Sequence, residues 1–304
     1  DQMARASLRS GAPDPAMAFA WTHYENNPYF RPPGYVYFLT GVYRLFGGSY
    51  AAPRLVQFGL GLLNAVLVWW LYRRIFGTRY ALWAALAAAL YWIFVYYEGT
   101  LYETTWLTFL LLLLAAALVR LYQIKTLAAA ALAGVVFAAG VVARPNLLAC
   151  GLPIAAWIWI AARSPQSRRW SGGAWAFLGA ALLAIAPVTL RNYAKSGELV
   201  LVSANAGINL YAGNNEISDG YTPGGPLLGF WDCFDYATLC ARIGQQAGRP
   251  LNYSETSGYL AREALRYAVQ HPQRTLALAG KKTLLFWGPK EVGNEEEEEL
   301  ERMD

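Results

Sequence analysis

The sequence predicts an all-α polytopic membrane protein with juxtamembrane segments on the outer face and a small mixed extracytoplasmic region. Three observations support this class. Of the 304 residues, 56% are hydrophobic and 15% are charged, whereas a soluble domain carries about 25% charged residues. Between residues 26 and 197 the acidic residues are Glu98 and Glu103, so the other 18 of the 20 acids lie outside this stretch. Within it, six apolar stretches approach the length of about 20 residues that a helix needs to cross a bilayer.

The first predicted segment, residues 1–55, is an outer-face loop with interfacial helices. Within it, Pro32 and Pro33 lead into an aromatic-rich run from Gly34 to Phe46. This run is shorter than the roughly 20 residues that a span requires. We therefore expect it to lie in the membrane interface or to dip into it.

The second segment, residues 56–190, is predicted to be a six-span transmembrane bundle. Trp and Tyr cluster at the edges of its apolar stretches, where amphipathic rings favour the membrane interface. Cys150, inside the fifth stretch, is expected to be a small buried apolar residue. The six stretches are Val56 to Tyr72, Tyr80 to Tyr97, Thr104 to Val119, Leu127 to Ala143, Leu147 to Ala162 and Trp175 to Leu190.

Basic residues are distributed unevenly between the loops of this bundle. One set of alternate loops contains Arg144 alone, and the other contains Arg73, Arg74, Arg79, Arg120, Lys125, Arg163, Arg168 and Arg169. Loops rich in Lys and Arg tend to stay in the cytoplasm. The chain before Val56 and after Arg191 is therefore predicted to lie on the outer face of the cytoplasmic membrane. We attribute the net charge of +5 to this orienting signal, so no nucleic-acid partner is expected.

The third segment, residues 191–304, is predicted to be an extracytoplasmic region with an amphipathic surface helix, truncated before further spans. Its run Glu198–Ser203 resembles a strand. A helix is expected with Ser254 as its cap and Ser257–Val269 as its body. The run Gln273–Trp287 suits a helix that lies on the membrane surface.

Common catalytic and metal-binding motifs are missing from the sequence, which has no zinc-ligand spacing, phosphate loop, Rossmann glycine pattern or nucleophile elbow. The two histidines, His23 and His271, lie far apart and support neither a triad nor a metal site. No cofactor is indicated, although a divalent metal stays open. Cys233 and Cys240 lie in the outer region, where disulfides are permitted. A bridge between them and two free thiols are both compatible with the sequence.

Charged residues near the predicted outer face form the most informative pattern. Such groups at the ends of membrane helices are costly and are functional candidates by default. Each also has a simpler interpretation, because a basic residue at a membrane edge can extend to water and the acids can pair with the arginines. Together they favour a pocket for an anionic ligand that also needs a base. The group comprises Glu98, Glu103, Arg144, Arg31 and Arg191, with Asp14 and Glu25 in the preceding loop.

Short motifs in a fixed order carry a family resemblance that covers nearly the whole chain. They are Asn27–Leu39, Tyr43–Gly47, Arg54–Gln57, Arg73–Gly77, Ala143–Asn146, Pro187–Tyr193, Ser203–Asn215, Gly248–Leu251 and Lys282–Trp287. In order and spacing they resemble the bacterial polyprenyl-phosphate-sugar-dependent glycosyltransferases. This group includes the dolichyl-phosphate-mannose protein mannosyltransferase-like enzymes (glycosyltransferase family 39-like) and the lipid A aminoarabinose transferases. No single motif decides the resemblance.

The resemblance implies an integral-membrane inverting glycosyltransferase of the GT-C helical-bundle architecture. Its donor would be a polyprenyl-phosphate sugar, and its acceptor a lipid, glycan or protein on the outer face. Arg31 matches a basic position near the donor phosphate, and Arg144 matches a basic position at the outer end of a span. Glu103 matches an acidic position at the start of a helix.

Site residues are assigned from the resemblance and the charge pattern together. Arg31, Arg144 and Arg191 are assigned to the donor phosphate, because arginine binds phosphate oxygens with a bidentate fork. Glu103 and Asp1 are the catalytic candidates, although the essential aspartate of the family is expected just upstream of Asp1. Hydrogen bonding within a turn is the alternative role for the asparagines among the substrate-binding candidates. These candidates are Glu98, Glu25, Tyr35, Asn205, Asn209 and Asn214.

Two other classes of function stay open. A transporter or flippase for an anionic lipid-linked substrate would also place charged groups in a helical bundle. Such proteins show internal repeats and broken helices at the membrane midplane, and the sequence shows neither clearly. A non-catalytic homologue is the second alternative, because the expected aspartate is not in the sequence.

Overall fold

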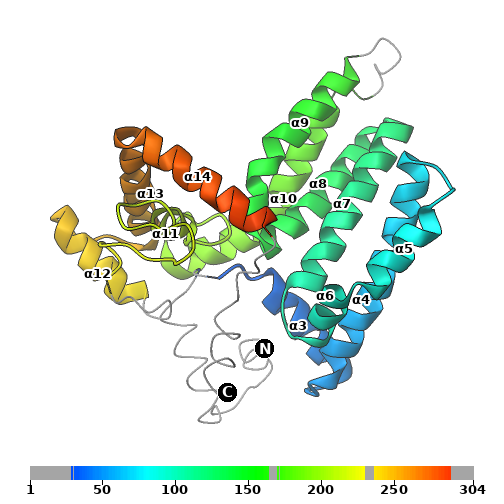
Figure 1. The fold of residues 1–304 in the computed structure, drawn as a ribbon, viewed down its shortest axis with the longest axis horizontal. Helices are drawn as coiled ribbons and strands as arrows, with labels where there is room; N and C mark the ends of the chain where they lie inside the picture. Colours follow the sequence, from blue (N-terminus) through cyan, green and yellow to red (C-terminus); the bar gives the residue numbers. More distant parts are fainter. Residues whose placement is uncertain (1–28, 30, 164–169, 171, 230–235, 289–304) are drawn as a thin grey trace. The chain divides into compact units, whose positions relative to one another are not determined.

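The computed structural model describes residues 29, 31–163, 170, 172–229 and 236–288. It divides the chain into two compact units, residues 1–203 and 204–304, each of which is described by itself below. Every regular element of the described residues is a helix (Figure 1). Several of these helices are long and apolar enough to cross a membrane. The predicted class, an all-α polytopic membrane protein, is confirmed.

The first unit begins with α3, Gly34–Phe46, followed by α4, Ala51–Ile75. The run that was predicted to be too short to span is thus a helix of 13 residues. Its buried residues are Leu39, Val42 and Tyr43, so one face of the helix packs inward. α3 packs against α4 and against α8, Leu127–Ala143.

The second predicted span is a broken helix. It consists of α5, Ala81–Leu90, and α6, Trp92–Gly99, which are bent by 51° relative to each other. Between them, Tyr91 has an extended backbone (φ −70°, ψ 112°) that interrupts the helical hydrogen bonds. α7, Thr104–Ile124, follows as a continuous apolar helix of 21 residues.

The rest of the first unit consists of α8, a short 3-10 turn, α9 and α10. The turn is Pro145–Leu147, α9 is Leu148–Ala162 and α10 is Gly173–Ser196. All six predicted stretches are therefore helical. Within the described residues, four helical stretches meet the length and hydropathy of a span, or up to five if the bent pair counts as one. α8, with 17 residues, is apolar but too short to be counted among these stretches.

A seam between α8 and α10 forms the core of the first unit. Gly134 on α8 lies directly against the carbonyl oxygen of Phe177 on α10, where no side chain would fit. Ala130, Ala133 and Ala138 are almost fully buried along the same helix. Small residues let membrane helices approach closely, and the van der Waals contact that results holds the helices together.

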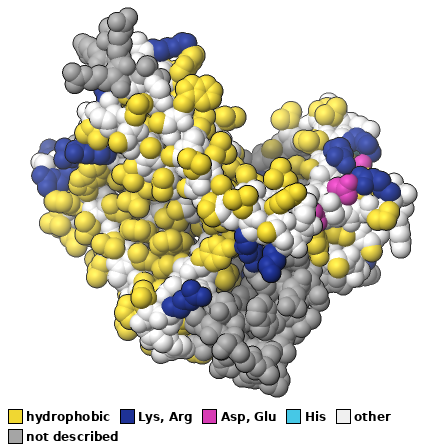
Figure 2. All heavy atoms as spheres, turned by 180° about the vertical axis from the view of Figure 1, so that it is seen from behind, with side chains coloured by type: hydrophobic (Ala, Val, Ile, Leu, Met, Phe, Trp, Pro, Cys, Tyr) yellow, Lys and Arg dark blue, Asp and Glu magenta, His cyan; other side chains and the backbone are white. Residues whose placement is uncertain are grey.

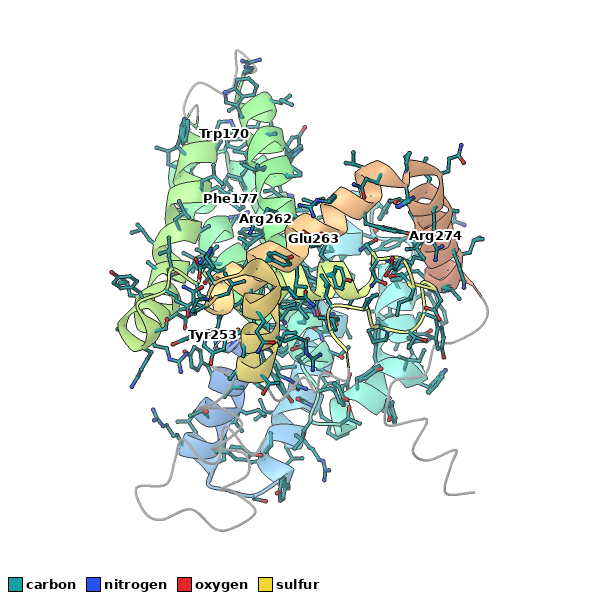
Figure 3. All side chains as sticks on the ribbon, turned by 90° about the vertical axis from the view of Figure 1, so that its left-hand side faces the viewer. Trp170, Phe177, Tyr253, Arg262, Glu263 and Arg274 are labelled. Carbon is teal, nitrogen blue, oxygen red and sulfur yellow. The ribbon has the colours of Figure 1, made fainter. Side chains whose placement is uncertain are left out.

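α8 and α10 run in the same direction along this seam. Ala130 faces Gly173 near the beginning of both helices, and the rings of Phe137 and Phe177 lie 5.3 Å apart further along. Trp170, which is fully buried, and Phe177 lie among the helices of the bundle (Figure 3). Parallel packing brings the ends of both helices, with Arg144 and Arg191, to the same end of the bundle.

Basic residues gather at the opposite end, in the loops that the sequence predicted to be cytoplasmic. A broad hydrophobic surface covers the helices of the first unit (Figure 2), as lipid contact requires. Each of five cations stacks on an aromatic ring, an attraction that suits the membrane interface. The pairs are Arg73 on Trp69, Arg74 on Trp70, Arg79 on Tyr80, Lys125 on Tyr122 and Arg163 on Trp159.

Two local predictions for the first unit are wrong. Glu198–Ser203 forms no strand, because side chains of α10 take its carbonyl groups: Asn192 donates to Val200 and Val202 (3.1 and 3.2 Å), and Thr189 donates to Leu201. Cys150, expected to be buried, is exposed on α9. In a membrane span that exposure places the thiol on the lipid-facing surface.

The second unit contains α11, Ala206–Ala212, α12, Tyr236–Ala247, α13, Tyr253–Gln270, and α14, Pro272–Trp287. α11 packs tightly on α13, where Gly207 lies against the backbone of Ser257. The predicted helices at 257–269 and 273–287 are confirmed. The cap of α13 is Asn252, in a capping box with Glu255, and not Ser254 as predicted.

Candidate functional site

Two arginines flank a close crossing between α3 and α8. At this crossing a Cβ atom on Gly34 would lie 2.6 Å from the Cα of Ala143, so the approach requires glycine. Arg31 precedes Gly34 by three residues, and Arg144 directly follows Ala143. Because three residues of chain reach at most about 10 Å, both arginines lie at the same end of the bundle. The structure thus places Arg31 and Arg144, which were predicted to bind phosphate, at the end of the bundle where Arg191 also lies.

Arg144 forms an ion pair with Glu103. Its Nη2 lies 3.1 Å from the Oε1 of Glu103, and the two side chains are 56% and 29% exposed. Arg144 leaves the end of α8 with an extended backbone because Pro145 follows it, and proline disfavours a helical conformation of the preceding residue. Glu103 directly precedes α7, which packs against α8. A pair this exposed is worth about 0–1 kcal/mol, so it contributes little to stability, and its consequence is that a carboxylate lies beside the guanidinium group.

Gln57 is the centre of the polar contacts at this end, and the sequence analysis did not identify it as a site residue. It is fully buried on α4. Its Oε1 accepts a hydrogen bond from the hydroxyl of Tyr35 (2.6 Å), and its Nε2 donates to the carbonyl oxygens of Thr100 (2.5 Å), Glu98 (3.1 Å) and Tyr97 (3.4 Å). A glutamine within an apolar stretch was the available signal, because polar groups in a membrane helix need partners.

This network places two of the predicted substrate-binding residues. Tyr35 on α3 and Glu98 on α6 are both tied to α4 through Gln57. The Glu98 carboxylate lies directly over Gly61 of α4, where a side chain would collide with it. Glu98 and Glu103, which the sequence placed on one loop, therefore face different surroundings. Glu98 faces α4, and Glu103 faces Arg144.

Arg191, the third residue predicted to bind phosphate, lies near the end of α10. Its Nη1 donates to the Oδ1 of Asn192 (3.3 Å). Asn192 is almost fully buried and holds the chain that follows α10 through its bonds to Val200 and Val202. Arg191 is thus anchored beside the exit of the chain from the bundle.

The three predicted asparagines belong to the second unit. Asn205 directly precedes α11, and Asn209 lies within that helix. Asn214 donates to the carbonyl oxygen of Leu210 (2.8 Å), one helical turn back. The neighbouring Asn215, which the sequence analysis did not select, is 2% exposed. Its Nδ2 donates to Tyr211 (2.7 Å) and to Gly224 (2.6 Å), which fixes the loop after α11.

Lys282 on α14 closes a second polar cluster in this unit. Its Nζ donates to the carbonyl oxygen of Gly213 (2.6 Å) and to the Oδ1 of Asn214 (3.4 Å). Partial burial lowers the pKa of the Lys282 ammonium group from its usual value, because desolvation disfavours the charged form. A cavity of about 170 Å³ beside it is lined by Asn209 and Tyr221.

Several predicted residues lie outside the described part of the chain, among them Asp1, Asp14, Glu25 and Cys233. Cys240, the other half of the proposed disulfide, is buried on α12. Across the described ranges, no group of three or more His, Cys, Asp or Glu side chains is arranged to hold a metal ion. The chemistry available at the described site is therefore that of two arginines and an ion-paired carboxylate, which suits an anionic ligand.

Comparison with known proteins gives one match. A family model for dolichyl-phosphate-mannose-protein mannosyltransferase matches residues 30–190, more than half of the chain. The matched region includes Arg31, Gln57, Glu98, Glu103 and Arg144, and it ends before the second unit. No curated protein and no solved structure matches the chain.

Proposed function

The chain belongs to the dolichyl-phosphate-mannose-protein mannosyltransferase family, and from this premise we propose that it transfers a sugar from a polyprenyl phosphate. The chain is a multi-pass membrane glycosyltransferase of the GT-C type. The proposed acceptor is a lipid, a glycan or a protein on the outer face of the cytoplasmic membrane. The proposed stereochemical outcome is inversion at the anomeric carbon.

The observation that carries this proposal is the α3–α8 crossing. It places Arg31 and Arg144 at one end of the bundle, where Glu103 forms an ion pair with Arg144. A polyprenyl-phosphate donor loses its sugar and becomes a more highly charged phosphate monoester. Cations that are already in place stabilise the charge that develops on such a leaving group. We assign the donor phosphate to Arg31 and Arg144, with Arg191 at the same end of the bundle.

The proposed reaction is a single displacement. The acceptor oxygen forms a bond to the anomeric carbon while the bond from that carbon to the phosphate oxygen breaks. The bonding electron pair leaves with the polyprenyl phosphate, and the acceptor proton passes to a carboxylate base. Attack opposite the leaving group inverts the anomeric centre, as in single-displacement glycoside hydrolysis. Glu103 is the described candidate for the carboxylate, and Asp1 is the second candidate.

Further residues are proposed to contact the substrate. Glu98 and Tyr35, which are both hydrogen-bonded to Gln57, belong to this proposed set, as do Asn205, Asn209 and Asn214. Glu25 completes the proposed set.

The proposed orientation rests on the charge distribution of the first unit. Arg31, Arg144 and Glu103 lie at one end, and the cations that stack on aromatic rings lie at the other. Because positively charged loops favour the cytoplasm, we assign the end with Arg144 to the outer face. Cysteine labelling from either side of the membrane tests this, since a cysteine at position 163 should react from inside and one at position 101 from outside.

One feature favours the alternative function, a transporter or flippase for an anionic lipid-linked substrate. The bent pair α5–α6 is a broken helix, and broken helices form substrate sites in transporters. The two functions differ in their product. A glycosyltransferase releases sugar-free polyprenyl phosphate, whereas a flippase moves the intact donor between leaflets.

Transfer by the full-length protein in proteoliposomes tests the proposal. Polyprenyl phosphates carrying labelled mannose, glucose or aminoarabinose serve as donors, and membranes of the source cell serve as the acceptor pool. Loss of a preorganised charge-stabilising donor costs about 10²–10³ in rate, so Arg31→Ala and Arg144→Ala should each reduce transfer at least 100-fold. Arg249→Ala, which breaks an exposed ion pair with Glu255 in the second unit, is the matched control. Unchanged transfer in the first two variants would contradict the phosphate assignment.

A further inference from the structure

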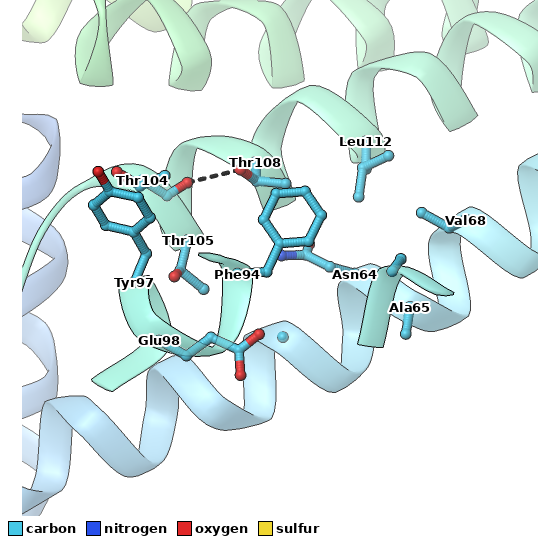
Figure 4. Close-up of a pocket in the computed structure, with 12 residues that line it drawn as sticks. Asn64, Ala65, Val68, Phe94, Tyr97, Glu98, Thr104, Thr105, Thr108 and Leu112 are labelled. Atoms are coloured by element: carbon cyan, nitrogen blue, oxygen red, sulfur yellow. Dashed lines mark hydrogen bonds between the residues drawn. The ribbon is translucent and has the colours of Figure 1, made fainter. Parts of the chain in front are cut away.

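A cavity of about 110 Å³ lies inside the first unit, chiefly between α4, α6 and α7 (Figure 4). Its polar lining consists of Asn64 from α4, Glu98 from α6, and Thr104, Thr105 and Thr108 from α7. The rest of the wall is apolar and aromatic. The lining does not include Arg31, Arg144 or Glu103, so the cavity is separate from the proposed phosphate site, although it shares Glu98 with the proposed substrate-binding residues.

The polar groups of the described lining are a carboxylate, an amide and three threonine hydroxyls, and none of them is positively charged. The Glu98 carboxylate sits over Gly61, and the Oδ1 of Asn64 is buried without a hydrogen-bond partner in the described structure. Thr105 is 4% exposed. None of the described lining residues is a Lys, Arg or His, and no described cation forms an ion pair with Glu98. The cavity therefore presents a carboxylate and an unused amide oxygen without a positively charged side chain to match them.

Such an arrangement is costly unless a positive ligand completes it. A carboxylate within a membrane helix normally pairs with a positive group or faces water, and a buried acceptor loses free energy when it has no partner. Glu98 also lies next to the C-terminal residue of α6, where the partial negative charge of the helix end favours a cation.

We propose that this cavity binds a small monovalent cation through the Glu98 carboxylate, the Asn64 Oδ1 and the Thr105 hydroxyl. One carboxylate balances one positive charge. Calcium takes six to eight oxygen ligands, usually from several carboxylates, and the described lining does not supply them. A water molecule needs roughly 10–15 Å³ of such space, so the cavity has room for an ion with several waters. The cation would hold α4, α6 and α7 together where the protein supplies no positive side chain.

Thermal unfolding of the purified full-length protein in detergent tests this inference. The reference buffer contains N-methyl-D-glucamine chloride, whose cation is too large for the cavity. NaCl, KCl or LiCl replaces it at constant ionic strength, and tryptophan fluorescence reports the midpoint. A ligand that binds only the folded state raises its stability with concentration, so at least one small cation should raise the Tm by several degrees and saturate.

Two substitutions connect this response to the cavity. Glu98→Gln should abolish the cation-dependent shift, and its Tm in the reference buffer should exceed that of the wild type because the unpaired charge is gone. Asn64→Leu should move the half-saturating cation concentration at least tenfold higher, and it serves alone if Glu98→Gln does not fold. Glu263→Gln, which removes a carboxylate paired with Arg266 in the second unit, should keep the wild-type response.

The inference is overturned if Na⁺, K⁺ and Li⁺ leave the wild-type Tm at its value in N-methyl-D-glucamine. It is also overturned if Glu98→Gln, or Asn64→Leu in its place, retains the full response. Because the measurement is unfolding and not sugar transfer, its result does not depend on the proposed function.

Discussion

The α8–α10 seam and the α4–α6–α7 side of the same bundle are held together in different ways. Along the seam, Gly134 and the buried alanines of α8 bring two helix backbones into contact. On the other side, α4 and α6 are connected by the hydrogen bonds of Gln57, and a cavity separates parts of α4, α6 and α7. The α8–α10 seam is thus closely packed, whereas the α4–α6–α7 side is held by side-chain hydrogen bonds beside a cavity.

This difference indicates how the bundle combines rigidity with a site. Van der Waals contact between small residues leaves no room for a ligand, so the seam acts as a scaffold. Side-chain hydrogen bonds hold specific groups in place while leaving a cavity beside them. The ion pair of Glu103 and Arg144 connects the two sides, because Glu103 precedes α7 and Arg144 ends α8. The candidate site thus lies where the scaffold meets the polar side.

The largest expected effect comes from breaking the seam. Gly134→Leu places a side chain where the carbonyl oxygen of Phe177 already lies, and overpacking of this kind costs about 1–3 kcal/mol or more. Gly179→Leu, on α10, is the matched control because a Cβ atom there meets nothing within 4 Å. Thermal unfolding in detergent should show a large loss for the first variant and little change for the second. Equal losses would contradict the scaffold role of the seam.

Removing the polar network should have the next largest effect. Gln57→Leu keeps the side-chain volume but leaves the carbonyl groups of Thr100 and Glu98 without their donor, which costs about 1–3 kcal/mol. Sugar transfer should also fall, because α6 carries Glu98 and the chain after α6 leads to Glu103. Gln245→Leu on the exposed face of α12 is the control, and both stability and transfer should stay at wild-type values there.

The seam and the polar side were not equally predictable from the sequence. Hydropathy identified all six predicted stretches of the bundle. Each stretch is apolar along its whole length, because its side chains face either lipid or other helices. Hydropathy did not identify the break at Tyr91, where one extended residue without proline or glycine interrupts an apolar run. Averages over about 20 residues are insensitive to such a change. Gly34 likewise gave no sign that it would let α3 cross α8 so closely.

Site residues followed the same pattern. Charge scarcity singled out Arg31, Arg144 and Glu103, because a charged group in an apolar stretch is conspicuous. Gln57 and Asn215 were missed, because the sequence does not show which groups an uncharged amide will contact in the fold. Those partners are backbone carbonyls that folding brings together, up to 43 residues away for Gln57. The strand predicted at 198–203 was wrong for a related reason, since Asn192 takes two of its carbonyl groups.

A smaller loss of stability is expected from Tyr35, and it tests whether Tyr35 and Gln57 are energetically coupled. Tyr35→Phe removes the hydroxyl that donates to Gln57, and a single hydrogen bond contributes about 0.5–1.5 kcal/mol. In the Gln57→Leu background the same substitution should cost nearly nothing, because its acceptor is already gone. A double-mutant cycle of unfolding free energies measures this coupling. Additive losses would show that the two side chains act independently.

The exposed helix cap of α13 tests whether a hydrogen bond contributes more to stability when it is buried in the bundle. Asn252 caps α13 by accepting from the backbone N–H of Glu255 (2.9 Å), at an exposed position. Loss of such a cap costs about 0.5–2 kcal/mol, and Asn252→Ala should fall at the low end. Ser254→Ala, within the helix, should cost less. A loss at Asn252 as large as that of Gln57→Leu would contradict a special role for the bundle interior.

The smallest expected effect is a difference in pH dependence between the exposed Glu255 carboxyl of the second unit and the buried Gln57 of the bundle. The backbone N–H of Asn252 and the Arg249 guanidinium hold the pKa of the Glu255 carboxyl below its usual value. A carboxyl with a lowered folded-state pKa stabilises the fold above its unfolded pKa of about 4.3, and this stability is lost as the pH falls through the lower, folded value. The Tm difference between wild type and Glu255→Gln should therefore be present at pH 7 and should disappear as the pH falls through the lowered pKa of the folded state. The loss of Tm caused by Gln57→Leu should be the same at neutral and acidic pH, because an amide does not titrate and Gln57 is fully buried. If that loss also vanished in acid, solvent would have to reach the polar side of the bundle.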